Sequence, residues 1–331
     1  MNQVRITSRI KGKVWHMLNM RHRLRNWDDK RYLKLLYWVN LGTIPNLDQP
    51  VTFNEKLQWL KLHDRDPHYT TLVDKLAVKS WVTEQIGEDR VIPLLGAWDS
   101  FDDIDFNDLP AQFVLKCTHD SGGLVICQDI KNFDHEGARN IIEHSLSSNY
   151  FSLGREWPYR DVKPRVLAEV YFPGWRPDSH VAEREDTALD PGAGSTPTPP
   201  GSTEGVIDYK FYCFHGEPEF LYVSQGLHDH RTAKMVFLNP DWTPAGFRRL
   251  DYRDFDPLPP KPRRLEQMIT IARQLSKNIP FVRVDLFEHE GHVLFSEMTF
   301  TPVSGMMPFD PPDADRAIGQ LLDLSRVEKR R

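Results

Sequence analysis

The 331-residue chain carries a formal net charge of −5, with 40% hydrophobic and 27% charged residues. This is the composition of a soluble globular protein large enough for two or three lobes, and the negative balance argues against nucleic acid as its main partner. The three cysteines lack metal-ligand spacing and no apolar run is long enough to span a bilayer, so we expect a cytoplasmic protein in a reducing compartment.

Residues 1–70 are predicted to form a basic, helical N-terminal region. The first 34 residues hold ten lysines and arginines against two aspartates, with apolar residues between them. Such a segment can lie at an anionic membrane surface, which would place the protein peripherally at the inner face of the membrane; a solvated basic face is the alternative. Apolar residues at helical spacing predict a helix from Lys30 to Leu41, and Thr52 with Glu55 forms a capping box that begins another.

The next region, residues 71–170, brings a lysine next to a glycine-rich turn. A strand that carries Lys116 runs into Ser121-Gly122-Gly123 before a second strand returns. Such a turn lets backbone N–H groups approach phosphate oxygens, and the neighbouring lysine supplies positive charge. The turn is not a Walker A loop, and a glycine hairpin with an incidental lysine is the alternative. The predicted elements are helices over Thr71–Ile86 and Phe133–Ser147 and strands over Val91–Trp98, Gln112–Cys117 and Pro164–Phe172, the last of which carries Glu169.

A polar insertion separates this region from the C-terminal one, residues 208–331. Residues 171–207 are rich in Pro, Gly, Ser and Thr, which predicts a flexible surface segment. Order is predicted to return in strands over Asp208–Phe214 and Glu219–Ser224 and in an amphipathic helix over Arg264–Lys277.

The segment from Phe281 to Thr299 predicts a second hairpin. Side chains alternate across a strand, so Arg283 and Asp285 share one face, and Phe295 and Glu297 are expected to share a face of the return strand. The hairpin can bring Asp285 and Glu297 side by side, where two carboxylates repel and one stays protonated unless a cation lies between them. Mg²⁺ is the expected cation, because it takes oxygen ligands from one or two carboxylates and from substrate phosphates. Two solvent-facing carboxylates are the alternative.

Six short motifs occur in a recognisable order along the chain: Thr52-Phe-Asn-Glu-Lys-Leu-Gln-Trp-Leu-Lys61, Val114-Leu-Lys-Cys117, Ser121-Gly-Gly123, Asp208-Tyr-Lys-Phe211, Phe281-Val-Arg-Val-Asp285 and Glu297-Met-Thr-Phe-Thr-Pro302. In combination they resemble the ATP-grasp superfamily, and more closely its branch named after the teichuronopeptide biosynthesis protein TupA. The resemblance covers about residues 45 to 325 and is carried by the combination, since each motif alone is weak.

This resemblance implies an α+β, ATP-grasp fold in which two α+β lobes, residues 71–170 and 208–331, grip MgATP after the helical N-terminal region. It implies ATP and Mg²⁺ as cofactors. By position, the nucleotide would be bound by Lys75, Lys116, Ser121, Gly122, Gly123, Glu169, Val170, Tyr171, Asp208 and Lys210. Asp285, Glu297 and Thr299 would ligate Mg²⁺, although the superfamily usually has Asn where Thr299 stands. Arg283 and Lys116 would be catalytic, acting on the phosphoryl group in transfer.

ATP-grasp ligases activate a carboxylate as an acyl phosphate for attack by an amine, so the resemblance implies an ATP-dependent carboxylate–amine ligase. The expected partners are ATP, a uronic-acid glycan of a bacterial capsule or cell wall, and an amino compound. Two alternatives stay open. One is a glycosyltransferase of polysaccharide biosynthesis, whose Asp-x-Asp motif only Asp64-Arg-Asp66 could match, and the other is an ATP-grasp kinase that phosphorylates a glycan.

Overall fold

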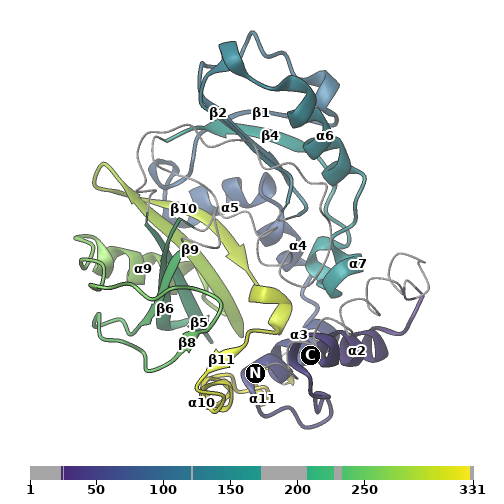
Figure 1. The fold of residues 1–331 in the computed structure, drawn as a ribbon, viewed down its shortest axis with the longest axis vertical. Coiled ribbons are helices and arrows are strands. Elements are labelled where there is room, and N and C mark those ends of the chain that lie inside the picture. Colours follow the sequence, from purple (N-terminus) through teal and green to yellow (C-terminus); the bar gives the residue numbers. More distant parts are fainter. Residues whose placement is uncertain (1–23, 25, 121, 173–206, 227–232, 329–331) are drawn as a thin grey trace.

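Two antiparallel sheets form the body of the protein, one at the top of Figure 1 and the other at its lower left. The computed structural model describes residue 24 and residues 26–120, 122–172, 207–226 and 233–328. Ahead of the sheets stand the helices α2 (Asp29–Leu41), α3 (Phe53–His63), α4 (His68–Val73) and α5 (Ala77–Ile86). This mixture of helices and antiparallel sheets, with a helical region before them, confirms the predicted α+β class.

The first sheet has the strand order β1-β4-β2-β3, and α6 covers one of its faces. Because successive side chains of a strand point to opposite faces, Phe113, Leu115 and Cys117 of β2 pack in a core with Ile142 of α6, whereas Lys116 lies on the other face. The elements of this part are η1 (Glu88–Arg90), β1 (Leu94–Trp98), η2 (Phe101–Asp103), β2 (Phe113–Cys117), β3 (Leu124–Cys127), η3 (Ile130–Asn132), α6 (His135–Leu146), α7 (Phe151–Gly154), η4 (Trp157–Tyr159) and β4 (Val166–Val170).

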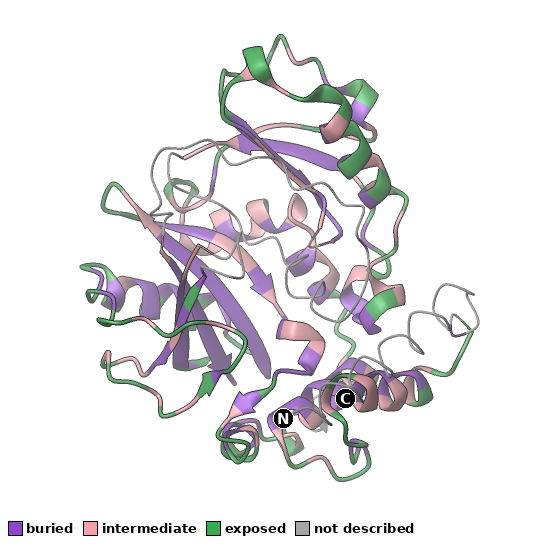
Figure 2. Cartoon of the chain, viewed as in Figure 1, coloured by how far each residue is buried: buried purple, intermediate pink, exposed green. Residues whose placement is uncertain are grey.

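The second sheet has the order β10-β9-β5-β6-β7, and its strands are buried along most of their length (Figure 2). Val282 and Val284 of β9 pack in a core with Met268 of α9, while Arg283 and Asp285 lie on the opposite face. Its elements are β5 (Asp208–Phe214), β6 (Glu217–Gln225), β7 (Lys234–Leu238), α9 (Leu265–Leu275), β9 (Phe281–His289) and β10 (His292–Thr299). Around it lie β8 (Arg248–Arg249), η5 (Pro302–Gly305), β11 (Phe309–Asp310), α10 (Ala314–Leu321) and α11 (Ser325–Glu328), with β8 and β11 paired to each other.

A bulge at Ser296 interrupts the pairing of β10 with β9. Phe295 lies opposite Leu286, yet Glu297 lies opposite Asp285. One extra residue in a strand moves every later side chain to the other face. The prediction that Phe295 and Glu297 share a face is therefore wrong: Phe295 belongs to the apolar core, and Glu297 lies on the face of Asp285. The predicted pairing of Asp285 with Glu297 is confirmed, and the bulge makes it possible.

The single helix predicted over Thr71–Ile86 is in fact two helices, α4 and α5, which separate after Asp74. The Asp74 carboxylate accepts hydrogen bonds from two backbone N–H groups at the start of α5, at 2.8 and 3.2 Å. A short polar side chain that binds nearby N–H groups competes with a continuous helix and favours a cap. The break leaves Lys75 outside both helices, with its backbone N–H bound to the carbonyl of Thr118 (3.1 Å) beside the glycine-rich turn.

Helix α3 anchors the segment that follows β10. It begins with the predicted capping box of Thr52 and Glu55. The buried side-chain amide of Asn54 donates to the Met307 carbonyl (2.8 Å) and accepts from the Met307 N–H (2.9 Å). The Asn54 N–H also donates to Asp315 near the start of α10 (2.9 Å). These bonds replace strand pairing for Met307 and hold the chain beyond the second sheet against α3.

The other predicted helices and strands are present within a few residues of their expected bounds. Residues 1–23, residue 25 and residues 173–206 lie outside the described residues. The anionic contact of residues 1–34, the flexible insertion at residues 171–207 and the lobe boundaries therefore stay predictions. Among the residues that the structure describes, none of the helices combines the length and the apolar character needed to cross a membrane.

Asn54→Ala should destabilise the fold, because both backbone groups of Met307 would lose their partner inside the protein. An unmatched buried polar group costs about 1–3 kcal/mol, so we expect a loss of about 2–4 kcal/mol in the free energy of unfolding, measured with urea. Asn107→Ala, at an exposed position, is the control and should change stability by less than about 0.5 kcal/mol. Equal stability of the two variants would contradict the anchoring role of α3.

Candidate functional site

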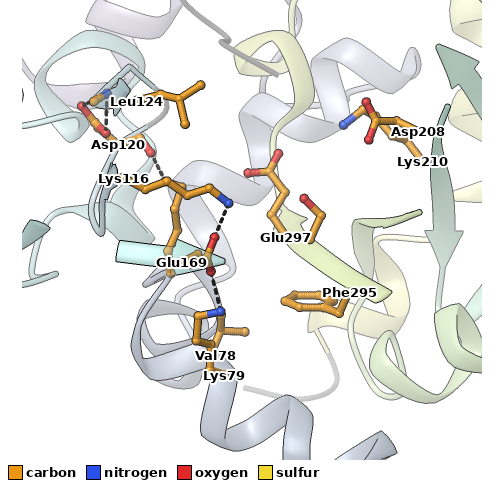
Figure 3. Close-up of a pocket in the computed structure, with 13 residues that line it drawn as sticks. Val78, Lys79, Lys116, Asp120, Leu124, Glu169, Asp208, Lys210, Phe295 and Glu297 are labelled. Atoms are coloured by element: carbon orange, nitrogen blue, oxygen red, sulfur yellow. Dashed lines mark hydrogen bonds and ion pairs between the residues drawn. The ribbon is translucent and has the colours of Figure 1, made fainter. Parts of the chain in front are cut away.

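A cleft of about 690 Å³, its solvent-open part included, lies between the polar faces of the two sheets. Its lining combines four lysines, four carboxylates and three apolar side chains from both sheets and from the start of α5 (Figure 3). These residues are Lys75, Lys79, Lys116, Lys210, Asp120, Glu169, Asp208, Glu297, Val78, Leu124 and Phe295, together with Gly123 and Ser296.

The wall formed by the first sheet centres on the buried carboxylate of Glu169. One of its oxygens pairs with Lys116 (2.6 Å) and the other with Lys79. Burial alone would raise the pKa of Glu169, but the two ammonium groups outweigh it and hold the pKa below its usual value. Burial above all lowers the pKa of Lys116, and the positive charges of Lys79 and Lys75 lower it further. The Glu169 carboxylate acts to raise this pKa but does not outweigh them. The wall therefore concentrates positive charge at the cleft.

The glycine-rich turn closes the upper end of this wall. The Lys75 ammonium donates a hydrogen bond to the carbonyl of Asp120. The Asp120 carboxylate accepts hydrogen bonds from the Gly123 N–H (3.2 Å) and from the Ser145 hydroxyl. A β-carbon at Gly123 would collide with the side chains of Ser145 and Cys117, so the turn can lie this close to the strand only with glycine there. Lys75, Gly123 and Asp120 line the cleft and Gly122 adjoins it, while Ser121 lies outside the described residues.

The opposite wall is a buried network of two cations and two carboxylates on β5, β9 and β10. Arg283 donates two hydrogen bonds to Asp285 (both 2.7 Å) and one to Glu297 (3.0 Å). Lys210 pairs with Asp285 at 2.6 Å. The cation that the sequence requires between Asp285 and Glu297 is therefore supplied by Arg283 itself. Burial alone would lower the pKa of Arg283, but Asp285 above all outweighs it, and the pKa lies well above its ordinary value.

The predicted metal ligands differ in how open they are. The Glu297 side chain is 23% exposed and points into the cleft (Figure 3). Asp285 is 1% exposed and is not among the residues that line the cleft. A carboxylate has about four acceptor positions, and three hydrogen bonds from Arg283 and Lys210 leave one on Asp285. These hard oxygen donors fit Mg²⁺, which is usually held by one or two carboxylates together with substrate phosphates. Thr299 donates to Glu297 (3.3 Å). Within the described ranges no group of three or more His, Cys, Asp and Glu has the arrangement of a metal site.

The remaining predicted site residues lie at different depths. Asp208 and Lys210 line the cleft from β5. Val170 and Tyr171 lie at and just beyond the end of β4: the Val170 N–H donates to the Pro93 carbonyl (3.2 Å), and the Tyr171 hydroxyl accepts from Gln128 (3.1 Å). The roles of all these residues toward a nucleotide stay predictions.

The sequence reasoning did not assign Lys79 to the site, although this residue pairs with Glu169 on the cleft wall. The sequence did contain a signal, because Lys79 stands four residues after Lys75, and this spacing places two side chains on the same side of a predicted helix. Asp120 also lines the cleft, and its role in holding the turn depends on Ser145, which is distant in sequence.

The sequence profile of TupA-like ATP-grasp proteins matches residues 55–178 and 199–323 of this chain. The chain belongs to the TupA-like ATP-grasp family. The match confirms the predicted family and fold class and, with them, the expectation of an enzyme of the ATP-grasp kind. The two matched segments include every predicted site residue, from Lys75 to Thr299.

Solved structures that resemble the TupA-like chain include two D-alanine–D-alanine ligases. The enzyme of Helicobacter pylori has a TM-score of 0.41 and 14% identity, over 82% of this chain and 69% of that one. The enzyme of Bacillus anthracis complexed with ATP has a TM-score of 0.41 and 14% identity, over 78% and 68%. The ATP-grasp ligase PsnB complexed with a minimal precursor has a TM-score of 0.37 and 9% identity, over 77% of this chain and 62% of that one. No curated protein matches, and the assignment rests on the family profile.

Asp285→Asn should destabilise the protein, because Arg283 and Lys210 would keep their charges in a buried place without the carboxylate that balances them. Breaking a buried pair from one side costs about 3–5 kcal/mol, which urea unfolding of the ligand-free protein can measure. Asp254→Asn removes a carboxylate from the half-exposed pair with Arg248 and should cost less than about 1 kcal/mol. A more stable Asp285→Asn variant would show that repulsion from Glu297 dominates instead.

Proposed function

We propose that this chain is an ATP-dependent carboxylate–amine ligase that joins an amino compound to a uronic acid of a bacterial capsular or cell-wall polysaccharide. The observation that carries the proposal is the pair of facing walls: a lysine-rich wall around Glu169 and a wall of carboxylates held by Arg283, with one cleft between them. Phosphoryl transfer needs positioning and charge stabilisation more than a protein nucleophile, and the two walls supply both.

On the lysine-rich wall, Lys75 and Lys116 would bind the phosphates, together with the backbone of the turn at Gly122 and Gly123. ATP would supply the phosphoryl group. Glu297 and Asp285 would hold Mg²⁺, which would supply positive charge to the phosphates. The buried Glu169 would receive the adenine amino group near Val170 and Tyr171, as the family resemblance implies. Asp208 and Lys210 would complete the nucleotide contacts from β5.

On the other wall, Arg283 would stabilise the charge that develops during transfer. Its side chain is fully buried, Asp285 holds it in two places, and its Nη1 atom has no hydrogen-bond partner in the described part of the chain. A donor held in this way is preorganised for an oxygen that becomes more negative in the transition state. The acid's carboxylate would take the phosphoryl group, the amine would then attack the acyl carbon, and phosphate would leave.

The glycan and the amino compound enter the proposal through the family, whose name comes from teichuronopeptide biosynthesis. The glycosyltransferase alternative has little support at Asp64 and Asp66. Asp64 accepts the Tyr69 hydroxyl (3.0 Å) and Asp66 accepts the His68 N–H (3.0 Å), so both serve the turn between α3 and α4. Neither lines the cleft.

Phosphate release tests the proposal directly. With MgATP, a ligase should release phosphate only when a uronic-acid acceptor and an amine are both present, because the acyl phosphate is consumed by the amine. Removing Mg²⁺ with EDTA should stop the reaction. Stable phosphorylation of the glycan without an amine would identify a kinase, and transfer from a nucleotide sugar without ATP would identify a glycosyltransferase.

Arg283→Lys should lower turnover by about 100-fold, the order found when one preorganised donor is removed, while the affinity for MgATP changes little. Lysine keeps the charge but loses the planar fork that holds Asp285 and Glu297 together. Arg273→Lys, in a half-exposed pair with Glu217, is the matched control and should turn over like the unsubstituted enzyme. If Arg283→Lys weakens MgATP binding as much as it slows turnover, Arg283 binds the ground state rather than the transition state.

A further inference from the structure

The Glu169 carboxylate pairs with two lysines, although one lysine would balance its charge. The Glu169 side chain is 4% exposed, and Lys116 and Lys79 each approach a different carboxylate oxygen. A buried carboxylate is costly unless it is paired and hydrogen-bonded. One lysine satisfies that requirement, so the second lysine calls for another explanation.

The two lysines differ in where they lie. In Figure 3 the Lys116 ammonium lies between Glu169 and Glu297, at the cleft, whereas Lys79 lies on the far side of Glu169. Lys79 also donates to the backbone carbonyl of Ile92 (2.7 Å), just before β1. Lys79 is thus fixed by a charge and by a backbone acceptor, and Lys116 is the one directed at the space where phosphates would bind.

The proposed function gives Lys116 two partners that compete for it. Without nucleotide it pairs with Glu169, and with nucleotide it would turn its charge to the phosphates. A buried Glu169 left with no cation would oppose that change, because an uncompensated buried charge is strongly unfavourable. With Lys79 in place, the carboxylate keeps one counter-ion while Lys116 serves the phosphates.

We propose that Lys79 is a positioning residue that neutralises Glu169 and so frees Lys116 for the phosphates of the nucleotide. Lys79 would act through Glu169 and would not itself contact the phosphates. This inference rests on the proposed nucleotide site and adds a residue to it. The decisive test is therefore whether the effect of losing Lys79 depends on the charge of Glu169.

The experiment measures MgATP affinity by calorimetry for four variants of the full chain, with thermal unfolding as a check on folding. Lys79→Met should bind about 10- to 100-fold more weakly, the range expected for loss of one interaction with a charged group. Lys79→Arg keeps the charge and should bind within about threefold of the unsubstituted chain. Lys131→Met removes an exposed lysine of the same sheet region and should leave affinity unchanged.

The fourth variant, Lys79→Met with Glu169→Gln, should regain most of the affinity lost in Lys79→Met. The amide has no charge to compete for Lys116, and its oxygen can still accept the adenine amino group. Unchanged binding by Lys79→Met would overturn the inference. So would a double variant that binds no better than Lys79→Met, because Lys79 would then contact the phosphates directly or act only on folding. Failure of the unsubstituted chain to bind MgATP would overturn the proposed nucleotide site itself, and the inference with it.

Discussion

The bidentate pair of Arg283 with Asp285 is the interaction on which the site depends. Four charged groups lie together on one face of the second sheet, and the guanidinium contacts both carboxylates. Desolvation of four separate charges would be prohibitive, but cations and carboxylates balance here and are hydrogen-bonded. Three strands, β5, β9 and β10, each contribute to the network, so the fold and the site share one set of contacts.

Strand alternation explains how one protein builds both a core and this network from adjacent residues. Val282 and Val284 pack toward α9, whereas Arg283, which stands between them, and Asp285, which follows them, lie on the other face. The same holds in β2, where Lys116 lies between two residues of the α6 core. The backbone positions of these charged groups are therefore fixed by the same strands that build the two cores.

Much of this could be predicted from the chain, and the failures have physical causes. Local periodicity indicates which residues of β2 and β9 share a face, and the capping box of Thr52 and Glu55 marks the start of α3. The bulge at Ser296 could not be predicted, because it depends on register with β9 rather than on the composition of β10. The break after Asp74 could not be predicted without knowing that the Asp74 carboxylate binds the N–H groups at the start of α5. The Lys79–Glu169 pair joins residues 90 positions apart, a contact that only the tertiary fold creates.

In the part of the chain that the structure describes, the two walls of the cleft carry opposite charge imbalances. The first wall contains three lysines and two carboxylates, which leaves an excess of positive charge. These residues are Lys75, Lys79, Lys116, Asp120 and Glu169. Among the described residues, Lys210, Asp208 and Glu297 of the other wall line the cleft, and Arg283 and Asp285 are buried behind them, so that carboxylates outnumber cations there. A polyphosphate alone would suit the first wall and be repelled by the second. A polyphosphate with a divalent cation suits both, because its anionic side meets the lysines and its cationic side meets the carboxylates. Under the proposed function, the cleft would therefore suit the metal–nucleotide complex better than either ion alone.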